Sequence, residues 1–232
     1  MPKLSDLIEK IRKSNTHKEI LDIINFRGER RDGLFSKSKE SSYKFHGLCW
    51  EYSCRLYPEL QTGENPIPTL LVWSYNHNVD PHNHHFLVCK VDEGAVIVDV
   101  SYAQFIGFKI SHVSGKSSGI YLGSYQSLEK FCHEKDKVFA AEKFNKHWPE
   151  WVRIKSSYSV YSDKELPKNM ALKIPPEFKN YLVLNSEKAC DTDDCEYKVN
   201  IRELCKPIKL NHSVVNKTEQ KKQALVLTSF KR

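Results

Sequence analysis

The chain has 232 residues, of which 40% are hydrophobic, 9 are Gly and 10 are Pro, and this composition excludes collagen-like and wholly disordered proteins. Its net charge of +7 is spread along the chain and concentrated only near the end, so we do not expect nucleic acid as the main ligand. No run approaches the roughly 20 apolar residues that a transmembrane helix needs, which predicts a chain without a membrane span.

The start of the chain and its cysteines indicate the compartment. The first stretch is charged throughout and lacks the apolar segment of a secretory signal, so we expect a cytoplasmic protein or one exported without a cleaved signal peptide. The seven cysteines are odd in number and irregularly spaced, which favours reduced thiols. Cys190 and Cys195 lack a second pair of ligands at a matching spacing, and we expect neither a metal nor another cofactor.

The first part of the chain predicts three helices. Apolar side chains recur on one helical face over residues 4–13 and again over residues 17–26. A polar connection rich in Ser and charged residues follows. The third helix covers residues 46–60 and begins at or near Cys49, while Pro58 favours a bend or an end within it.

The rest of the chain predicts strands and one long helix. Two Val- and Ile-rich stretches, 84–91 and 95–102, form a hairpin around Asp92-Glu93-Gly94. The other expected elements are a strand at 69–75, a long helix at 127–148, and short strands at 181–185 and 196–201.

These elements predict one α+β domain over residues 1–215. It comprises the N-terminal helices within 4–26, a central region at 46–105 and a helical and mixed remainder. The last residues, 216–232, form a basic C-terminal tail. Tails of this kind are often poorly ordered, so we expect its removal to leave the chemistry of the domain intact.

Three residue types suited to nucleophilic catalysis follow one another along the central region. Cys49 lies at the start of a predicted helix, where unpaired N–H groups favour the thiolate. A histidine at the start of the next hairpin, His84 or His85, is suited to take up the thiol proton and return it to a leaving group. Asp99 on the returning strand is suited to orient that imidazole. The order Cys, His, Asp therefore predicts a thiol-dependent catalytic triad.

The turn of the hairpin determines which histidine faces Asp99. A three-residue Asp-Glu-Gly loop pairs Val91 with Ala95 and places His85 on the face of Asp99. A two-residue Glu-Gly loop pairs Asp92 with Ala95 and places His84 there instead. Adjacent strand residues point to opposite faces, so only one of the two is expected to reach both the thiol and the Asp99 carboxylate.

The sequence around Cys49 resembles that of known cysteine enzymes. Residues 47–53, GLCWEYS, resemble the Gly-x-Cys-Trp-x-aromatic-small motif around the nucleophile of transglutaminases and papain-like peptidases. Residues 84–87, HHFL, resemble the His-x-aromatic-aliphatic segment of the transglutaminase-like histidine, and residues 98–101, VDVS, resemble the segment that carries the aspartate. The short interval between Cys49 and the histidine favours the transglutaminase-like branch. The resemblance covers roughly residues 46–105.

The resemblance implies a fold and a function. The fold would be papain-like or transglutaminase-like, with a nucleophile-bearing helix packed on an antiparallel sheet. The function would be cysteine-dependent acyl transfer at an amide bond of a protein or peptide, by hydrolysis, glutamine deamidation or transamidation. The alignment selects His84 as the base, with His85 as the alternative.

Two further residues follow from the resemblance as substrate or oxyanion contacts. Trp50 follows the nucleophile, and its backbone N–H or that of Cys49 would supply one oxyanion donor. Gln104 lies in a Gln-Phe pair that resembles the same region of bacterial members. Val100 and Tyr43 depart from the pattern, since they replace a proline and a glutamine that donates to the oxyanion in papain-like peptidases.

Two other functions compete with this interpretation. His and Asp side chains cluster in the loop before the hairpin and are ordinary zinc or nickel ligands. This loop lacks the helical spacing of strong zinc motifs. A non-catalytic binding module on a degenerate enzyme scaffold is the other alternative. The loop residues in question are His77, Asp80, His82, His84 and His85.

Overall fold

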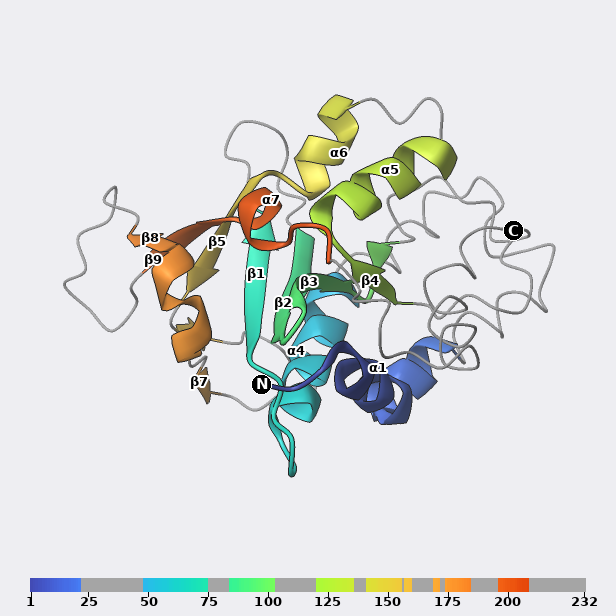
Figure 1. Cartoon of the computed structure of the whole chain (residues 1–232), viewed down its shortest axis with the longest axis vertical. Helices are drawn as coiled ribbons and strands as arrows, with labels where there is room; N and C mark the ends of the chain where they lie inside the picture. Colours follow the sequence, from blue (N-terminus) through green and yellow to red (C-terminus); the bar gives the residue numbers. More distant parts are fainter. Residues whose placement is uncertain are drawn as a thin grey trace.

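The computed structural model is built around an antiparallel sheet (Figure 1). It describes residues 1–21, 48–74, 84–102, 120–135, 141–155, 157–159, 169–171, 174–184 and 196–208. The main sheet has the strand order β4-β3-β2-β1-β5-β9-β8, and each of its described pairs is antiparallel. The bounds are β1 Thr69–Ser74, β2 His84–Val91, β3 Gly94–Asp99, β4 Tyr121–Gly123, β5 Trp151–Lys155, β8 Leu182–Leu184 and β9 Glu196–Asn200, with β6 Ser157–Ser159 and β7 Asn169–Ala171 pairing separately.

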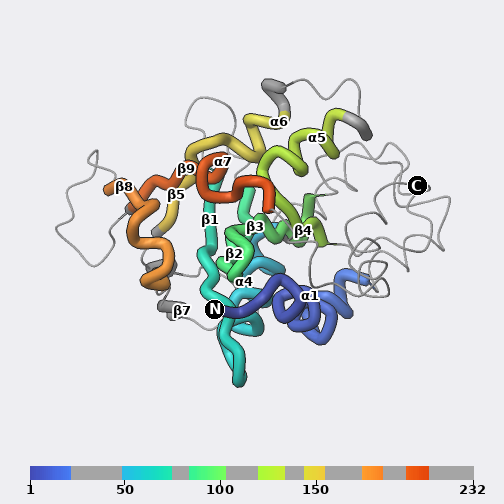
Figure 2. The backbone as a smooth tube through the Cα atoms, viewed as in Figure 1, coloured from blue at the N-terminus to red at the C-terminus, as the bar shows by residue number. Residues whose placement is uncertain are grey.

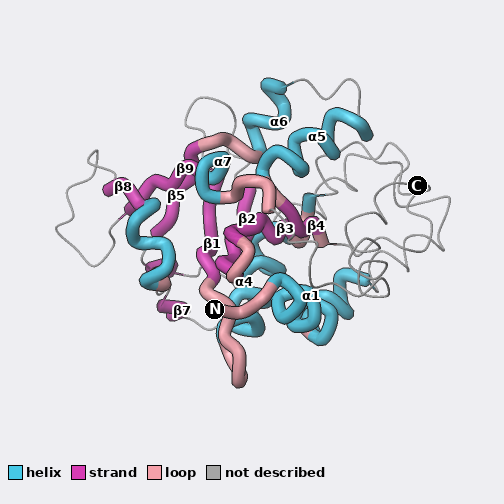
Figure 3. Tube along the Cα trace, viewed as in Figure 1, coloured by secondary structure: helices cyan, strands magenta, loops and turns pink. Residues whose placement is uncertain are grey.

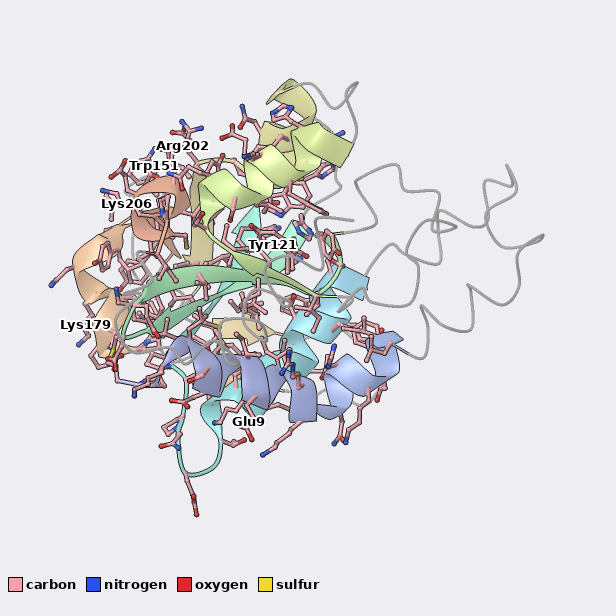
Figure 4. All side chains as sticks on the ribbon, turned by 45° about the vertical axis from the view of Figure 1, so that its right-hand side comes forward. Glu9, Tyr121, Trp151, Lys179, Arg202 and Lys206 are labelled. Atoms are coloured by element: carbon pink, nitrogen blue, oxygen red, sulfur yellow. The ribbon has the colours of Figure 1, made fainter. Side chains whose placement is uncertain are left out.

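Helices cover both faces of this sheet. Figure 4 shows the sheet between α5 on one side and α1 with α4 on the other, and Figure 3 shows the same layers by secondary structure. Residues 15–21 are also helical and follow α1. The bounds are α1 Leu4–Lys13, α4 Leu48–Gln61, α5 Tyr125–Lys135, α6 Ala141–His147 and α7 Ile201–Leu204, with a 3₁₀ helix at Pro176–Tyr181.

Alternating side chains of the central strands fill two separate cores. In β2, Phe86 and Val88 pack with α5 and α6, whereas Leu87, Cys89 and Val91 pack with α1 and α4. All five side chains are fully buried. A strand that is covered on both faces needs apolar residues at successive positions, which explains the Val- and Ile-rich sequence of the hairpin.

The hairpin closes through a two-residue loop that differs from both predicted turns. Val91 pairs with Gly94, so Asp92 and Glu93 form the loop. Gly94 has a φ of +150°, a conformation that L-residues with side chains rarely adopt. The N-terminal segment holds this turn in place, because the Asp92 N–H donates to the Pro2 carbonyl at 2.8 Å and the Leu4 N–H donates to Glu93 at 2.9 Å. Figure 2 shows this segment running from near the lower end of β1 to α1.

The α+β class predicted from the sequence is confirmed, and one helix prediction is wrong. The single helix expected at 127–148 is two helices, α5 and α6, which bury Phe131 and Phe144 in the same core. Helix α4 does not end at Pro58 but continues to Gln61, where Thr62 N–H bonds back to the Pro58 carbonyl. Among the described residues, no helix has the length and apolar character that crossing a bilayer requires. The predicted tail, 216–232, lies outside the described residues.

Candidate active site

Cys49 lies in the first turn of α4, where this helix packs against β1 and β2. The backbone N–H groups of a first helical turn have no partner within the helix and favour a nearby negative charge. The Cys49 side chain is 5% exposed. Ser53, one turn further along α4, donates its hydroxyl to the His85 carbonyl at 3.3 Å and ties the helix to the start of β2.

His84 and Asp99 form a fully buried pair. The Nε2 atom of His84 lies 2.6 Å from Oδ2 of Asp99, and both side chains have no exposed surface. An ionised carboxylate only accepts hydrogen bonds, so His84 donates from Nε2 and keeps Nδ1 for a second partner. Ser74 fixes the backbone of His84, because its hydroxyl accepts from the His84 N–H and donates to the His84 carbonyl, both at 3.1 Å.

Two further donors hold the Asp99 carboxylate in place. The indole Nε1–H of Trp148 donates to Oδ2 at 2.8 Å, and the backbone N–H of Ser101 donates to Oδ1 at 2.9 Å. Trp148 is fully buried, and its ring stands nearly perpendicular to that of His84 at a centroid distance of 5.5 Å. Both carboxylate oxygens are therefore engaged, which leaves His84 a fixed and negatively charged partner.

The electrostatics of Cys49 and His84 favour an ion pair. Burial raises the pKa of the Cys49 thiol, but hydrogen bonds with His84 and His85 and the charges of both imidazoles outweigh it and lower this pKa to about 5. Burial lowers the pKa of His84, whereas the charge and hydrogen bond of Asp99, followed by the interaction with Cys49, raise it to about 9. Near neutral pH the pair is therefore a thiolate and an imidazolium.

The two adjacent histidines take different positions at the site. Both lower the pKa of the Cys49 thiol, by hydrogen bonding and by charge. His84 is the first residue of β2 and His85 the second. Only His84 is bonded to Asp99, as the alignment of the motif had suggested. His85 instead packs against Trp50 and Trp73.

We expect Cys49 to be the most reactive of the five described thiols, all of which are buried and outside disulfides. Burial raises the pKa of Cys54 and Cys89 to about 12, and it also raises those of Cys132 and Cys205. At pH 7, alkylation followed by peptide mapping should label Cys49 at least about a hundredfold faster than the other four. Equal labelling of the five, or slow labelling of Cys49, would contradict the ion pair.

Trp148 is a site residue that the sequence did not indicate. It follows Asp99 by 49 positions, and its sequence context indicates only an ordinary core aromatic at the end of a helix. No local motif marks its indole N–H, because the contact depends on how α6 folds back over the sheet. Only a three-dimensional arrangement brings this donor to the carboxylate.

Replacing Trp148 with Phe should slow Cys49 labelling about three- to tenfold and destabilise the fold by about 1.5–3 kcal/mol, since a hydrogen bond to a charged group is lost. Denaturant unfolding and the pH dependence of the labelling rate measure the two effects. Phe144→Leu is the matched control, because Phe144 packs on Trp148 at 5.3 Å but takes no part in the pair. Equal slowing in both variants would show a packing effect only.

Some predicted site residues lie outside the described part of the chain. Gln104 is among them, as are His77, Asp80 and His82 of the alternative metal loop. Tyr43, the departure from the family pattern, also lies outside it. Within the described ranges no group of three or more His, Cys, Asp or Glu side chains is arranged to hold a metal ion.

Comparisons of the chain with family models, with curated proteins and with solved structures find no match. The function proposed below therefore depends on the site geometry and on the motif around Cys49.

Proposed function

We propose that the protein is a thiol enzyme that transfers acyl groups from amides through a thioester on Cys49. The observation that carries this proposal is the buried His84–Asp99 pair, joined at 2.6 Å, together with the lowered pKa that His84 gives the Cys49 thiol at the start of α4. The perturbed pKa values of Cys49 and His84 are of the kind that concentrates at functional sites. We place the protein with the papain-like and transglutaminase-like enzymes, which the packing of α4 on β2, the strand that begins at His84, supports.

The first half of the reaction forms the thioester. The Cys49 thiolate attacks the carbonyl carbon of the amide, and the π electrons of the carbonyl move to its oxygen. The His84 imidazolium then gives its proton to the nitrogen of the leaving group. The C–N bond breaks as the carbonyl re-forms, which releases an amine and leaves an acyl group on Cys49. Asp99 stabilises the imidazolium before this transfer and holds the ring in position.

The second half removes the acyl group. Neutral His84 takes a proton from an incoming water or amine, which attacks the thioester carbonyl. Collapse of this adduct returns the Cys49 thiolate and the His84 imidazolium. Water gives hydrolysis, or deamidation when the substrate is a glutamine side chain, while an amine gives transamidation. The acyl donor that we propose is a protein or peptide.

Intact-protein mass spectrometry after incubation with p-nitrophenyl acetate tests this proposal. The wild type should gain one acetyl group, which peptide mapping places on Cys49 and which water or an added amine then removes. Cys49→Ala should gain none, while Cys54→Ala, a matched loss of a buried thiol on the same helix, should acetylate like the wild type. Acetylation that persists in Cys49→Ala would contradict the proposed nucleophile.

A further inference from the structure

Two tryptophans fix the position of His85 beside the nucleophile. Trp73 is the cross-strand partner of His85, and the two rings stack with an interplanar angle of 5° and a centroid distance of 5.9 Å. Trp50, the residue after Cys49, meets the same imidazole edge-on at 4.8 Å. The backbone of His85 is also held, because its carbonyl accepts from Ser53. An imidazole held in this way is pre-organised rather than a mobile surface side chain.

The two histidines at the thiol differ in their surroundings. His84 is fully buried and bonded to Asp99, and the proposed reaction uses its proton for the leaving group. His85 is only partly buried; its imidazole lies against Trp50, the residue after Cys49, and it also lowers the pKa of the Cys49 thiol. The proposed acyl transfer therefore leaves one pre-organised imidazole at the reacting sulfur without a role.

The attack on a carbonyl produces an oxyanion, and the His85 imidazole is suited to stabilise it. As the C–S bond forms, negative charge leaves Sγ and develops on the carbonyl oxygen, which is separated from Sγ by the carbonyl carbon alone. A donor that already reaches Sγ in the free enzyme lies close to this oxygen. Donors that are fixed before the reaction stabilise such an oxyanion most effectively, and histidine side chains are among those that serve.

We propose that the His85 imidazole N–H is the side-chain donor of the oxyanion hole, acting together with a backbone N–H at the start of α4. This inference rests on the proposed acyl transfer. His85 gives up no proton: its N–H bond stays intact and donates to the oxyanion in each tetrahedral adduct, while His84 carries out both proton transfers. Trp50 and Trp73 are then positioning residues that hold the imidazole.

Two reactions of Cys49 separate this role from an effect on the thiol itself. Iodoacetamide alkylates Cys49 by displacement at a saturated carbon, and this reaction forms no oxyanion. Acetylation by p-nitrophenyl acetate passes through an oxyanion. Because His85 also lowers the pKa of Cys49, both rates are compared at a pH where the thiolate is fully formed in each variant.

His85→Ala should acetylate at least tenfold and up to about a hundredfold more slowly than the wild type, the range expected for a lost oxyanion donor, with alkylation changed less than about threefold. His85→Gln keeps an N–H donor and should recover much of the acetylation rate. His133→Ala, an exposed histidine on α5, is the control and should match the wild type in both reactions.

Three outcomes would overturn the inference. Equal acetylation by His85→Ala and the wild type would show that the imidazole does not contact the oxyanion. A parallel loss of both reactions that His85→Gln does not relieve would show a structural role only. Absence of acetylation at Cys49 in the wild type would overturn the proposed function and this inference together, and the wild-type reaction alone distinguishes that case from the other two.

Discussion

His84→Ala is expected to lower the acetylation of Cys49 by p-nitroacetanilide, whose leaving nitrogen must be protonated, by at least about 10³-fold at pH 6, since loss of a general acid–base alone removes about 10²–10⁴. Without His84 the Cys49 pKa returns to the free-thiol value of about 8.5 or above, so roughly 0.3% of the thiol is ionised at this pH. The more basic thiolate is a better nucleophile, with a Brønsted slope of about 0.4–0.5. This gain in nucleophilicity offsets most of the loss in thiolate concentration.

Alkylation should therefore fall much less than acetylation in His84→Ala, by about tenfold at pH 6. The difference between the two reactions isolates the role of His84 in proton transfer from its effect on the thiolate. Circular dichroism of the variant checks that the fold is retained. If His84→Ala acetylates at the wild-type rate, the imidazole bonded to Asp99 is not the acid–base group.

Asp99→Asn is expected to lower the rate of acetylation by p-nitroacetanilide at pH 8 by about 10²-fold. The Asp99 charge is the largest of the contributions that raise the His84 pKa to about 9. Its removal therefore moves the high-pH limb of the pH–rate profile to lower pH. Above the lowered pKa, His84 is neutral and cannot protonate the leaving group. The pH–rate profile between pH 5 and about 10 measures this shift.

The geometry adds a second reason for the effect of Asp99→Asn. Asp99 accepts from His84, Trp148 and Ser101, so both of its oxygens serve as acceptors. An amide has one acceptor oxygen and places its NH₂ group against at least one of these donors. Asp92→Asn is the control, because it neutralises an exposed carboxylate at the turn of the same hairpin. An unchanged upper limb in Asp99→Asn would show that the carboxylate does not set the protonation of His84.

The sequence predicted the parts of the site that depend on local patterns. The motif around Cys49 lies at the start of helix α4, as predicted. The Val- and Ile-rich arms of the hairpin form β2 and β3, with His84 and Asp99 on one face. These features follow from periodicity within a few residues, which a single sequence carries. The turn itself was predicted wrongly, because the N-terminal segment bonds to Asp92 and Glu93 and no local rule includes that contact.

The rest of the site depends on contacts between distant segments. Trp148 reaches Asp99 only because α5 and α6 fold back over the sheet, and residues 127–148 have the composition of one continuous helix. The influence of His85 on the Cys49 thiol also depends on tertiary packing, because it follows from how α4 packs against the start of β2. Tertiary packing decides both features, and sequence periodicity does not record it.

The ultraviolet absorbance of the thiolate, measured as the difference between wild type and Cys49→Ala across a pH titration, tests the central claim most directly. The account predicts that the thiolate signal appears with a midpoint of about 5 and persists through neutral pH, because His84 and His85 hold the charge of Cys49. A midpoint at or above the free-thiol value of about 8.5 would contradict it, since Cys49 would then be an ordinary buried cysteine.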